Sequence, residues 1–226
     1  MGVEEAIKRL NDEYQQAPLN FPVEQAVQAR LVELLRENFT STLLARAGFR
    51  DDETTKYKQK YLKRIAKPQE ISPVQAEINF GFPTENKRLD IAILRPSALQ
   101  NQEQLDYLPS VEEQALTIRL VDGTKYYPVD AIKHAIEIKY IKNVDIAGSR
   151  LERDSIDEWP YFDRDLRKLS ELDDTDSRHL IVFTNKNPFQ KGEQDKRGTK
   201  KAQRRFQRVS SECAQRDITL SEIHPR

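Results

Sequence analysis

The segment "HAIEIKYIKN", residues 134–143, places a carboxylate and an ammonium two residues apart in an apolar run, at Glu137 and Lys139. Its pattern predicts a strand, and residues two apart in a strand point to the same side of the sheet. Ile136 and Ile138 then pack into the core from the opposite face. Such a pair is most often a solvated edge or a cross-strand ion pair. A buried carboxylate, however, is unfavourable unless it is paired or binds a cation.

A second carboxylate, Asp90, interrupts another predicted strand, "RLDIAIL", residues 88–94. Two carboxylates that are brought together repel each other, which raises their proton affinity or recruits a divalent metal. Hard oxygen ligands favour Mg²⁺, which keeps several waters and binds substrate phosphates. A neighbouring lysine could hold the attacking water or balance the charge of a phosphoryl transition state. These residue types therefore indicate phosphodiester chemistry if the fold brings them together.

A third carboxylate, Glu24, lies in the clearest predicted helix, residues 20–39. When the helix is wound at about 100° per residue, Glu24 falls inside the apolar stripe, and Glu33 and Glu37 fall outside it. The helix macrodipole would also favour an acidic residue near the helix start. The stripe is formed by Val23, Val27, Leu31, Leu34 and Leu35, and Pro22 suits the first turn.

The remaining elements predict an α/β domain with a mixed central sheet flanked by helices. Strands at 74–80 and 88–94 form a hairpin, and a second hairpin turns at Asp122–Gly123. A helix follows at 161–172 with Leu166 and Leu169 inward. The continuous apolar strand 179–185 is expected to be central, and it precedes a basic helix at 198–214 and an edge strand at 218–220.

The inward Glu24, the strand-borne Asp90, the Glu137-x-Lys139 pair and the elements that follow it together resemble the PD-(D/E)XK nuclease superfamily. The resemblance covers roughly residues 20–186 and implies the restriction-endonuclease-like fold. Leu89 stands before Asp90, where proline is common in the superfamily. The long gap between Asp90 and Glu137 implies an inserted hairpin that could carry substrate contacts or the surface of a homodimer.

The resemblance implies hydrolysis of phosphodiester bonds with Mg²⁺ or Mn²⁺, in DNA rather than RNA. Asp90, Glu137 and the backbone carbonyl of Ile138 would bind the metal, and Lys139 would orient or activate water. Glu24 would be an accessory carboxylate. We expect one nuclease-like domain over residues 1–226, with a core at about 20–186, an insertion at about 96–132 and a basic extension at about 187–226.

Basic residues gather in two segments although the chain carries no net charge. Residues 56–67 hold six basic residues and no acidic one, and residues 186–208 hold nine basic and two acidic residues. Each segment is either a solvated helix face or a surface that contacts the phosphates of a nucleic-acid backbone. Phosphate contacts of this kind do not distinguish one base sequence from another. The candidate nucleic-acid contacts are Lys58, Lys60, Lys63, Arg64, Arg204, Arg205 and Arg208.

Other function classes find little support. Cys213 is the single cysteine, so an internal disulfide is excluded and a reducing compartment is expected. No apolar run is long enough to span a membrane, and the start of the chain lacks a signal peptide, so we expect a cytoplasmic protein. Two alternatives remain, namely a non-catalytic nucleic-acid-binding or assembly protein with the same fold and a general α/β interaction domain. The latter predicts that Asp90 and Glu137 lie far apart.

Overall fold

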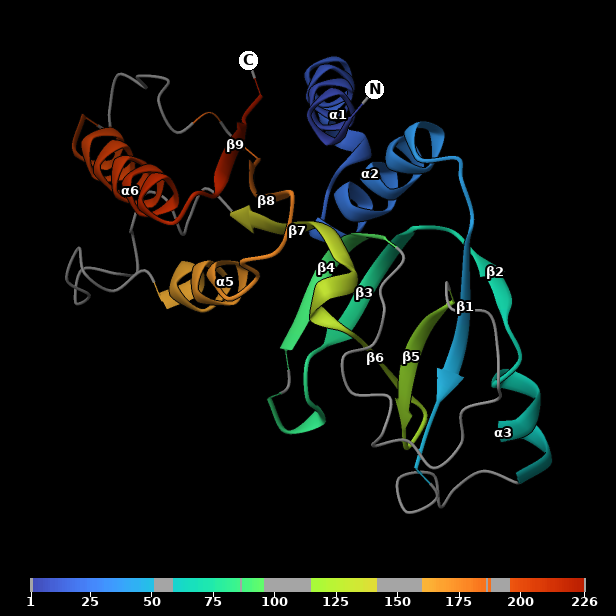
Figure 1. Cartoon of the computed structure of the whole chain (residues 1–226). Coiled ribbons are helices and arrows are strands. Elements are labelled where there is room, and N and C mark those ends of the chain that lie inside the picture. Colours follow the sequence, from blue (N-terminus) through green and yellow to red (C-terminus); the bar gives the residue numbers. More distant parts are fainter. Residues whose placement is uncertain are drawn as a thin grey trace. The chain divides into compact units, whose positions relative to one another are not determined.

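The computed structural model describes residues 2–50, 59–85, 87–95, 115–141, 160–185, 187 and 196–225 (Figure 1). It confirms an α/β architecture with a mixed nine-stranded sheet in the order β2-β1-β5-β6-β3-β4-β7-β8-β9, flanked by helices. The elements in chain order are α1 (Val3–Gln16), η1 (Pro18–Asn20), α2 (Glu24–Asn38), β1 (Leu43–Gly48), α3 (Gln59–Ile65), β2 (Gln69–Ile71), β3 (Val74–Phe80), η3 (Pro83–Glu85), β4 (Lys87–Leu94), β5 (Leu116–Val121), β6 (Thr124–Tyr127), η5 (Val129–Ala131), β7 (Ile132–Ile141), α5 (Pro160–Ser170), β8 (Ser177–Thr184), α6 (Lys196–Gln215) and β9 (Thr219–Ile223).

The chain divides into two compact units. Unit 1 comprises residues 1–35, 136–173 and 177–226, and unit 2 comprises residues 36–135 and 174–176. Strand β7 therefore begins in unit 2 and ends in unit 1. Glu24, Glu137 and Lys139 belong to unit 1, and Asp90 belongs to unit 2.

Unit 2 contains both predicted hairpins. β3 and β4 pair antiparallel, as do β5 and β6, while β1 runs parallel to β5. The β5–β6 turn places Asp122 and Gly123 at φ angles of 46° and 86°. Two successive positive φ values are what a tight hairpin turn requires, and the Asp-Gly pair supplies them at little steric cost.

Unit 1 pairs β8 parallel to β9, and Tyr14 of α1 donates a hydrogen bond of 2.7 Å to the Thr184 carbonyl. We did not predict α1 from the sequence, although its buried residues recur at helical spacing. The strand expected at 179–185 is confirmed as β8, but its predicted central place was wrong, because only β9 follows it in the strand order. Its apolar run reflects burial along the strand, since residues 179–184 are all buried.

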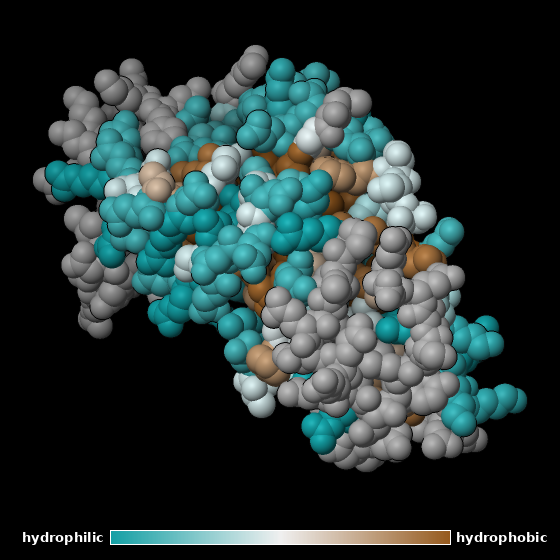
Figure 2. Space-filling model, in the orientation of Figure 1, coloured by the Kyte–Doolittle hydropathy of each residue, from teal (hydrophilic) through white to brown (hydrophobic). Residues whose placement is uncertain are grey.

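The short strands β1 and β2 were also missed from the sequence. β2 spans three residues with no buried side chain, and so offers no alternation to detect. Figure 2 shows hydrophilic residues over most of the described surface on this face, with hydrophobic residues emerging between them. Among the described helices, none is long and apolar enough to cross a membrane.

Candidate functional site

Glu137 and Lys139 lie on β7, as predicted, and the strand is covered on both sides where they occur. Ile136 and Ile138 are fully buried, and Glu137 is only 1% exposed. A solvated edge is therefore excluded for Glu137, and its carboxylate needs a partner in the interior. The structure supplies that partner from α5.

Lys168 of α5 is the cation that faces Glu137. Its Nζ lies 2.6 Å from Glu137 Oε1 and 3.2 Å from Asp165 Oδ1, and the Lys168 side chain is 12% exposed. The Asp165 side chain is itself buried. One ammonium thus bridges two buried carboxylates, an arrangement in which the loss of any member leaves an uncompensated charge.

Lys139 joins the same cluster through Asp165, with 3.0 Å between Lys139 Nζ and Asp165 Oδ2. Burial by itself lowers the pKa of Lys139, but the charge and hydrogen bond of Asp165, together with the charges of Glu137 and Glu24, outweigh it and raise the pKa. Lys139 is therefore an ammonium at neutral pH. It can orient water or offset negative charge, but it does not accept a proton.

Glu24, the first residue of α2, approaches the same part of β7. Its Oε2 accepts a hydrogen bond of 3.1 Å from the backbone N–H of Tyr140, the residue that follows Lys139. The predicted inward direction of Glu24 is thus confirmed. Val23 does not belong to the apolar stripe as predicted, because it is 46% exposed and precedes the helix.

The sequence prediction missed Asp165 and Lys168. On a helix wound at about 100° per residue, Asp165 lies about 40° from Leu169, and Leu169 was predicted to face inward. An acidic residue inside an apolar stripe was the signal that selected Glu24, and the same test applied to residues 161–172 would have selected Asp165, which lies between Leu169 and Leu172 on the helix face. Lys168 would then follow as its i+3 partner.

Asp90 lies on β4 in unit 2 and is half-buried. The β3–β4 pairing joins Ala76 to Ile91 and Ile78 to Leu89, and skips the intervening Glu77 and Asp90. Glu77 has a φ of 51°, in the left-handed region that side-chain-bearing residues seldom adopt. Asp90 thus stands opposite a strained residue, but its place beside Glu137 stays a prediction, as does a role for the Ile138 carbonyl.

A divalent metal fits the donor chemistry of the cluster. Glu137 and Asp165 direct oxygens at a single cation, the Lys168 ammonium, and carboxylate oxygens are the ligands that Mg²⁺ prefers. Glu137 and Asp165 would hold the metal, and the Lys168 ammonium, which contacts both carboxylates, would compete with it. Within the described ranges, no three acidic, histidine or cysteine side chains already surround a metal-sized point.

The predicted nucleic-acid contacts have mixed outcomes. Lys60, Lys63 and Arg64 are exposed on α3, and Arg204 and Arg208 are exposed on α6, so these five are placed where phosphates could reach them. Lys58 lies outside the described residues. Arg205 is 2% exposed, which contradicts a surface role. Arg205 lies on the same face of α6 as Phe206 and Val209, which are also buried.

Comparisons of the chain with protein-family models, with curated proteins and with solved structures found no match.

Proposed function

We propose that this chain is a metal-dependent nuclease of the PD-(D/E)XK type with the restriction-endonuclease-like fold. The observation that carries the proposal is the buried cluster of unit 1, in which Glu137 and Asp165 converge on one cation beside the ammonium of Lys139. Buried charges of this density add little to stability compared with apolar packing. The presence of these buried charges is therefore better explained by cation binding and phosphoryl chemistry than by a contribution to stability.

The chain's own residues have distinct roles in this proposal. Glu137 and Asp165 of unit 1 would hold a divalent cation, which would supply Lewis-acid polarisation of the phosphoryl oxygen when bound. A metal-binding role for Asp90, on β4 of unit 2, is what the family resemblance implies. Lys139 remains charged, orients the attacking water and offsets charge on the phosphoryl group. Glu24 fixes the backbone of β7 next to Lys139 through the Tyr140 N–H. Lys168 keeps the two carboxylates compensated before the metal binds.

DNA is the proposed substrate, because the resemblance implies it. The runner-up is a non-catalytic nucleic-acid-binding or assembly protein. One observation favours it, namely that both Glu137 and Asp165 already have lysine partners and so need no metal for compensation.

The proposal is tested by incubating the purified chain with supercoiled plasmid, labelled single-stranded DNA and labelled RNA in Mg²⁺, Mn²⁺ or EDTA. We expect cleavage of DNA with either metal, none in EDTA, and none in Asp90→Ala or Lys139→Ala. Lys8→Ala, which alters an exposed lysine of α1, is the matched control and should retain activity. Cleavage that survives both site substitutions would overturn the assignment, and nucleic-acid binding without cleavage would favour the runner-up.

A further inference from the structure

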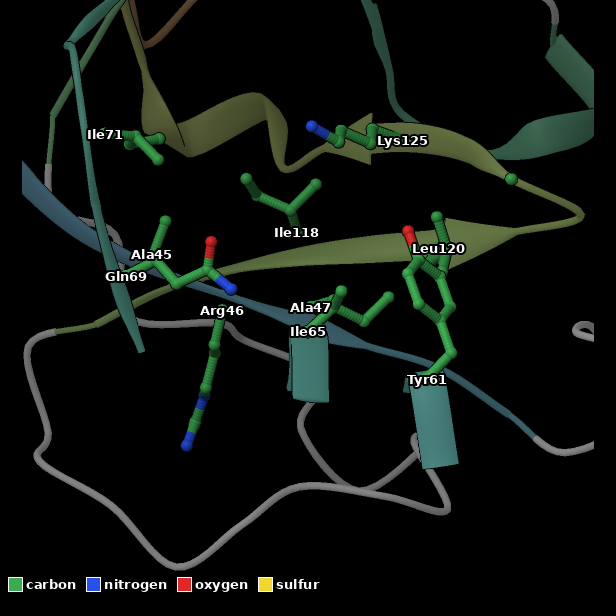
Figure 3. Close-up of a pocket in the computed structure, with 11 residues that line it drawn as sticks. Ala45, Arg46, Ala47, Tyr61, Ile65, Gln69, Ile71, Ile118, Leu120 and Lys125 are labelled. Carbon is green, nitrogen blue, oxygen red and sulfur yellow. The ribbon is translucent and has the colours of Figure 1, made fainter. Parts of the chain in front are cut away.

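Unit 2 contains a hollow of about 200 Å³ between α3 and the sheet, far in sequence from the charged cluster (Figure 3). Ala45 and Ala47 of β1 and Ile118 of β5 contribute to its apolar lining, and α3 contributes Tyr61 and Ile65. The alanines carry only a methyl group, which leaves open space where a larger residue would fill the interface. The hollow is smaller than the sites that hold drug-sized ligands, and so suits one ring system.

Four polar side chains line the hollow. Arg46 is buried and donates a hydrogen bond of 3.1 Å from Nε to Thr117 Oγ1, and the other three give the hollow a specific chemistry. The Tyr61 ring, the Gln69 amide and the Lys125 ammonium all belong to side chains that line the hollow (Figure 3). An aromatic face, an amide that both donates and accepts hydrogen bonds, and a cation are the groups that proteins use to bind unstacked nucleobases. Tyr61 is 49% exposed, so solvent reaches this edge of the hollow.

The sequence of α3 places basic residues beside the Tyr61 ring. When the helix is wound at about 100° per residue, Leu62 and Ile65 turn to one side of Tyr61, and Lys60 and Arg64 turn to the other. Leu62 is buried in the core of unit 2, whereas Lys60 and Arg64 are exposed. A base stacked on Tyr61 would therefore have its phosphates next to two cations, at the border between the apolar and basic faces.

The geometry points to a nucleobase pocket in unit 2 that receives one unstacked base of a single-stranded nucleic acid. Tyr61 stacks on the base, and Gln69 forms hydrogen bonds with the base edge. Lys125, Lys60 and Arg64 contact the flanking phosphates. Because a glutamine amide pairs best with adenine, the pocket should prefer adenine. The inference rests on the proposed function only in taking nucleic acid as the partner, since binding requires neither a metal nor cleavage.

The test is fluorescence anisotropy in EDTA, which prevents metal-dependent cleavage, with labelled single strands of adenines and the same backbone with abasic sites, each as DNA and as RNA. We expect Tyr61→Ala to weaken binding of the adenine strand by at least about tenfold and to leave the abasic strand unchanged. Tyr61→Phe should bind as wild type, because the stacking ring is kept. Gln69→Ala should remove the preference for adenine over other bases.

Two matched controls belong to the same experiment. Phe82→Ala removes an exposed aromatic ring of unit 2 outside the hollow, and Gln25→Ala removes an exposed amide of α2. Both should bind the adenine strand as wild type does. Equal affinity for adenine and abasic strands in the wild type would overturn the pocket, and so would equal weakening by Tyr61→Ala and Phe82→Ala. Base-dependent binding without any cleavage would uphold the pocket while rejecting the nuclease, so the two failures are distinguishable.

Discussion

The Lys168 ammonium lies 2.6 Å from Oε1 of Glu137, a carboxylate that is 1% exposed. The two residues come from α5 and β7 of unit 1 and share the neighbour Asp165. A buried ion pair of this kind adds little net stability compared with apolar packing, but breaking it leaves a charge without compensation. The pair is therefore a weak point of the fold, and in the proposed function it belongs to the cation site.

Substitution of Lys168 tests this coupling. Lys168→Met keeps an unbranched side chain of similar length but leaves Glu137 without its ammonium, and we expect a loss of about 3–5 kcal/mol in the free energy of unfolding. The double variant Lys168→Met/Glu137→Gln removes both charges and should recover much of that loss. Urea denaturation of the wild type, Lys168→Met, Glu137→Gln and the double variant forms a cycle that measures the coupling. Additive effects of the two substitutions would show that the pair is not coupled.

A divalent metal should compensate for the missing ammonium. In Lys168→Met, Glu137 and Asp165 have lost the cation on which they converge, so Mn²⁺ should bind more tightly than in the wild type and stabilise the variant more. The melting temperature, recorded with and without Mn²⁺, should rise more in Lys168→Met than in the wild type. Lys8→Met, at an exposed position of α1, controls for the loss of a surface charge. A Mn²⁺-induced rise that is the same in all three proteins would place metal binding elsewhere.

The raised pKa of Lys139 makes its contribution to stability dependent on pH. Burial lowers this pKa, but Asp165, Glu137 and Glu24 raise it above the ordinary value of 10.5. A raised pKa means that the folded state holds the proton more tightly than the unfolded state does. The stabilising contribution is therefore complete below pH 10.5 and is lost as the pH rises through the folded pKa.

The measurement compares the wild type with Lys139→Met in urea at a series of pH values. The wild type should be more stable at neutral pH, and the difference between the two proteins should shrink above pH 10.5. A difference that instead shrinks between pH 7 and pH 9 would mean that Lys139 loses its proton near neutrality. The role of Lys139 as a permanent cation would then be wrong.

The left-handed backbone of Glu77 predicts a stabilising substitution. Glu77 has a φ of 51° opposite Asp90, and its carboxylate forms an exposed ion pair with Arg88. Glycine adopts this conformation without the steric cost that Glu77 meets, whereas an exposed ion pair contributes little. Glu77→Gly should raise the melting temperature by about 2–4 °C. Arg88→Ala, which removes the ion pair but keeps the strained residue, should produce no such rise.

The sequence was sufficient to predict the elements whose periodicity is strong and local. The two hairpins, β7 and β8 follow from runs of apolar and turn residues, and the inward Glu24 follows from its position on one helix face. The same test on residues 161–172 selects Asp165 as an inward residue, but it does not say which strand Asp165 and Lys168 face, because they lie on a helix more than twenty residues later in the chain than Glu137. Their contact with Glu137 therefore depends on how the helix packs against β7, which the sequence pattern does not specify.

Three arginines of α6 that look equivalent in the sequence differ in their burial. Arg204, Arg205 and Arg208 are equally basic in sequence, yet Arg205 is buried and the other two are exposed. The helical period of α6, on which Phe206 and Val209 face inward, sets this difference. Composition alone predicted a basic segment, and only the helix face decides which of its residues a phosphate can reach.

Isothermal titration calorimetry with Mn²⁺ tests the central claim, that Glu137 belongs to a metal site, most directly. The wild type should bind Mn²⁺ with a measurable heat, and Glu137→Gln, which keeps the shape of the side chain but removes its charge, should lose that binding. Glu33→Gln, which alters an exposed carboxylate on α2, should bind as the wild type does. Mn²⁺ binding that is the same in Glu137→Gln and in the wild type would contradict the account.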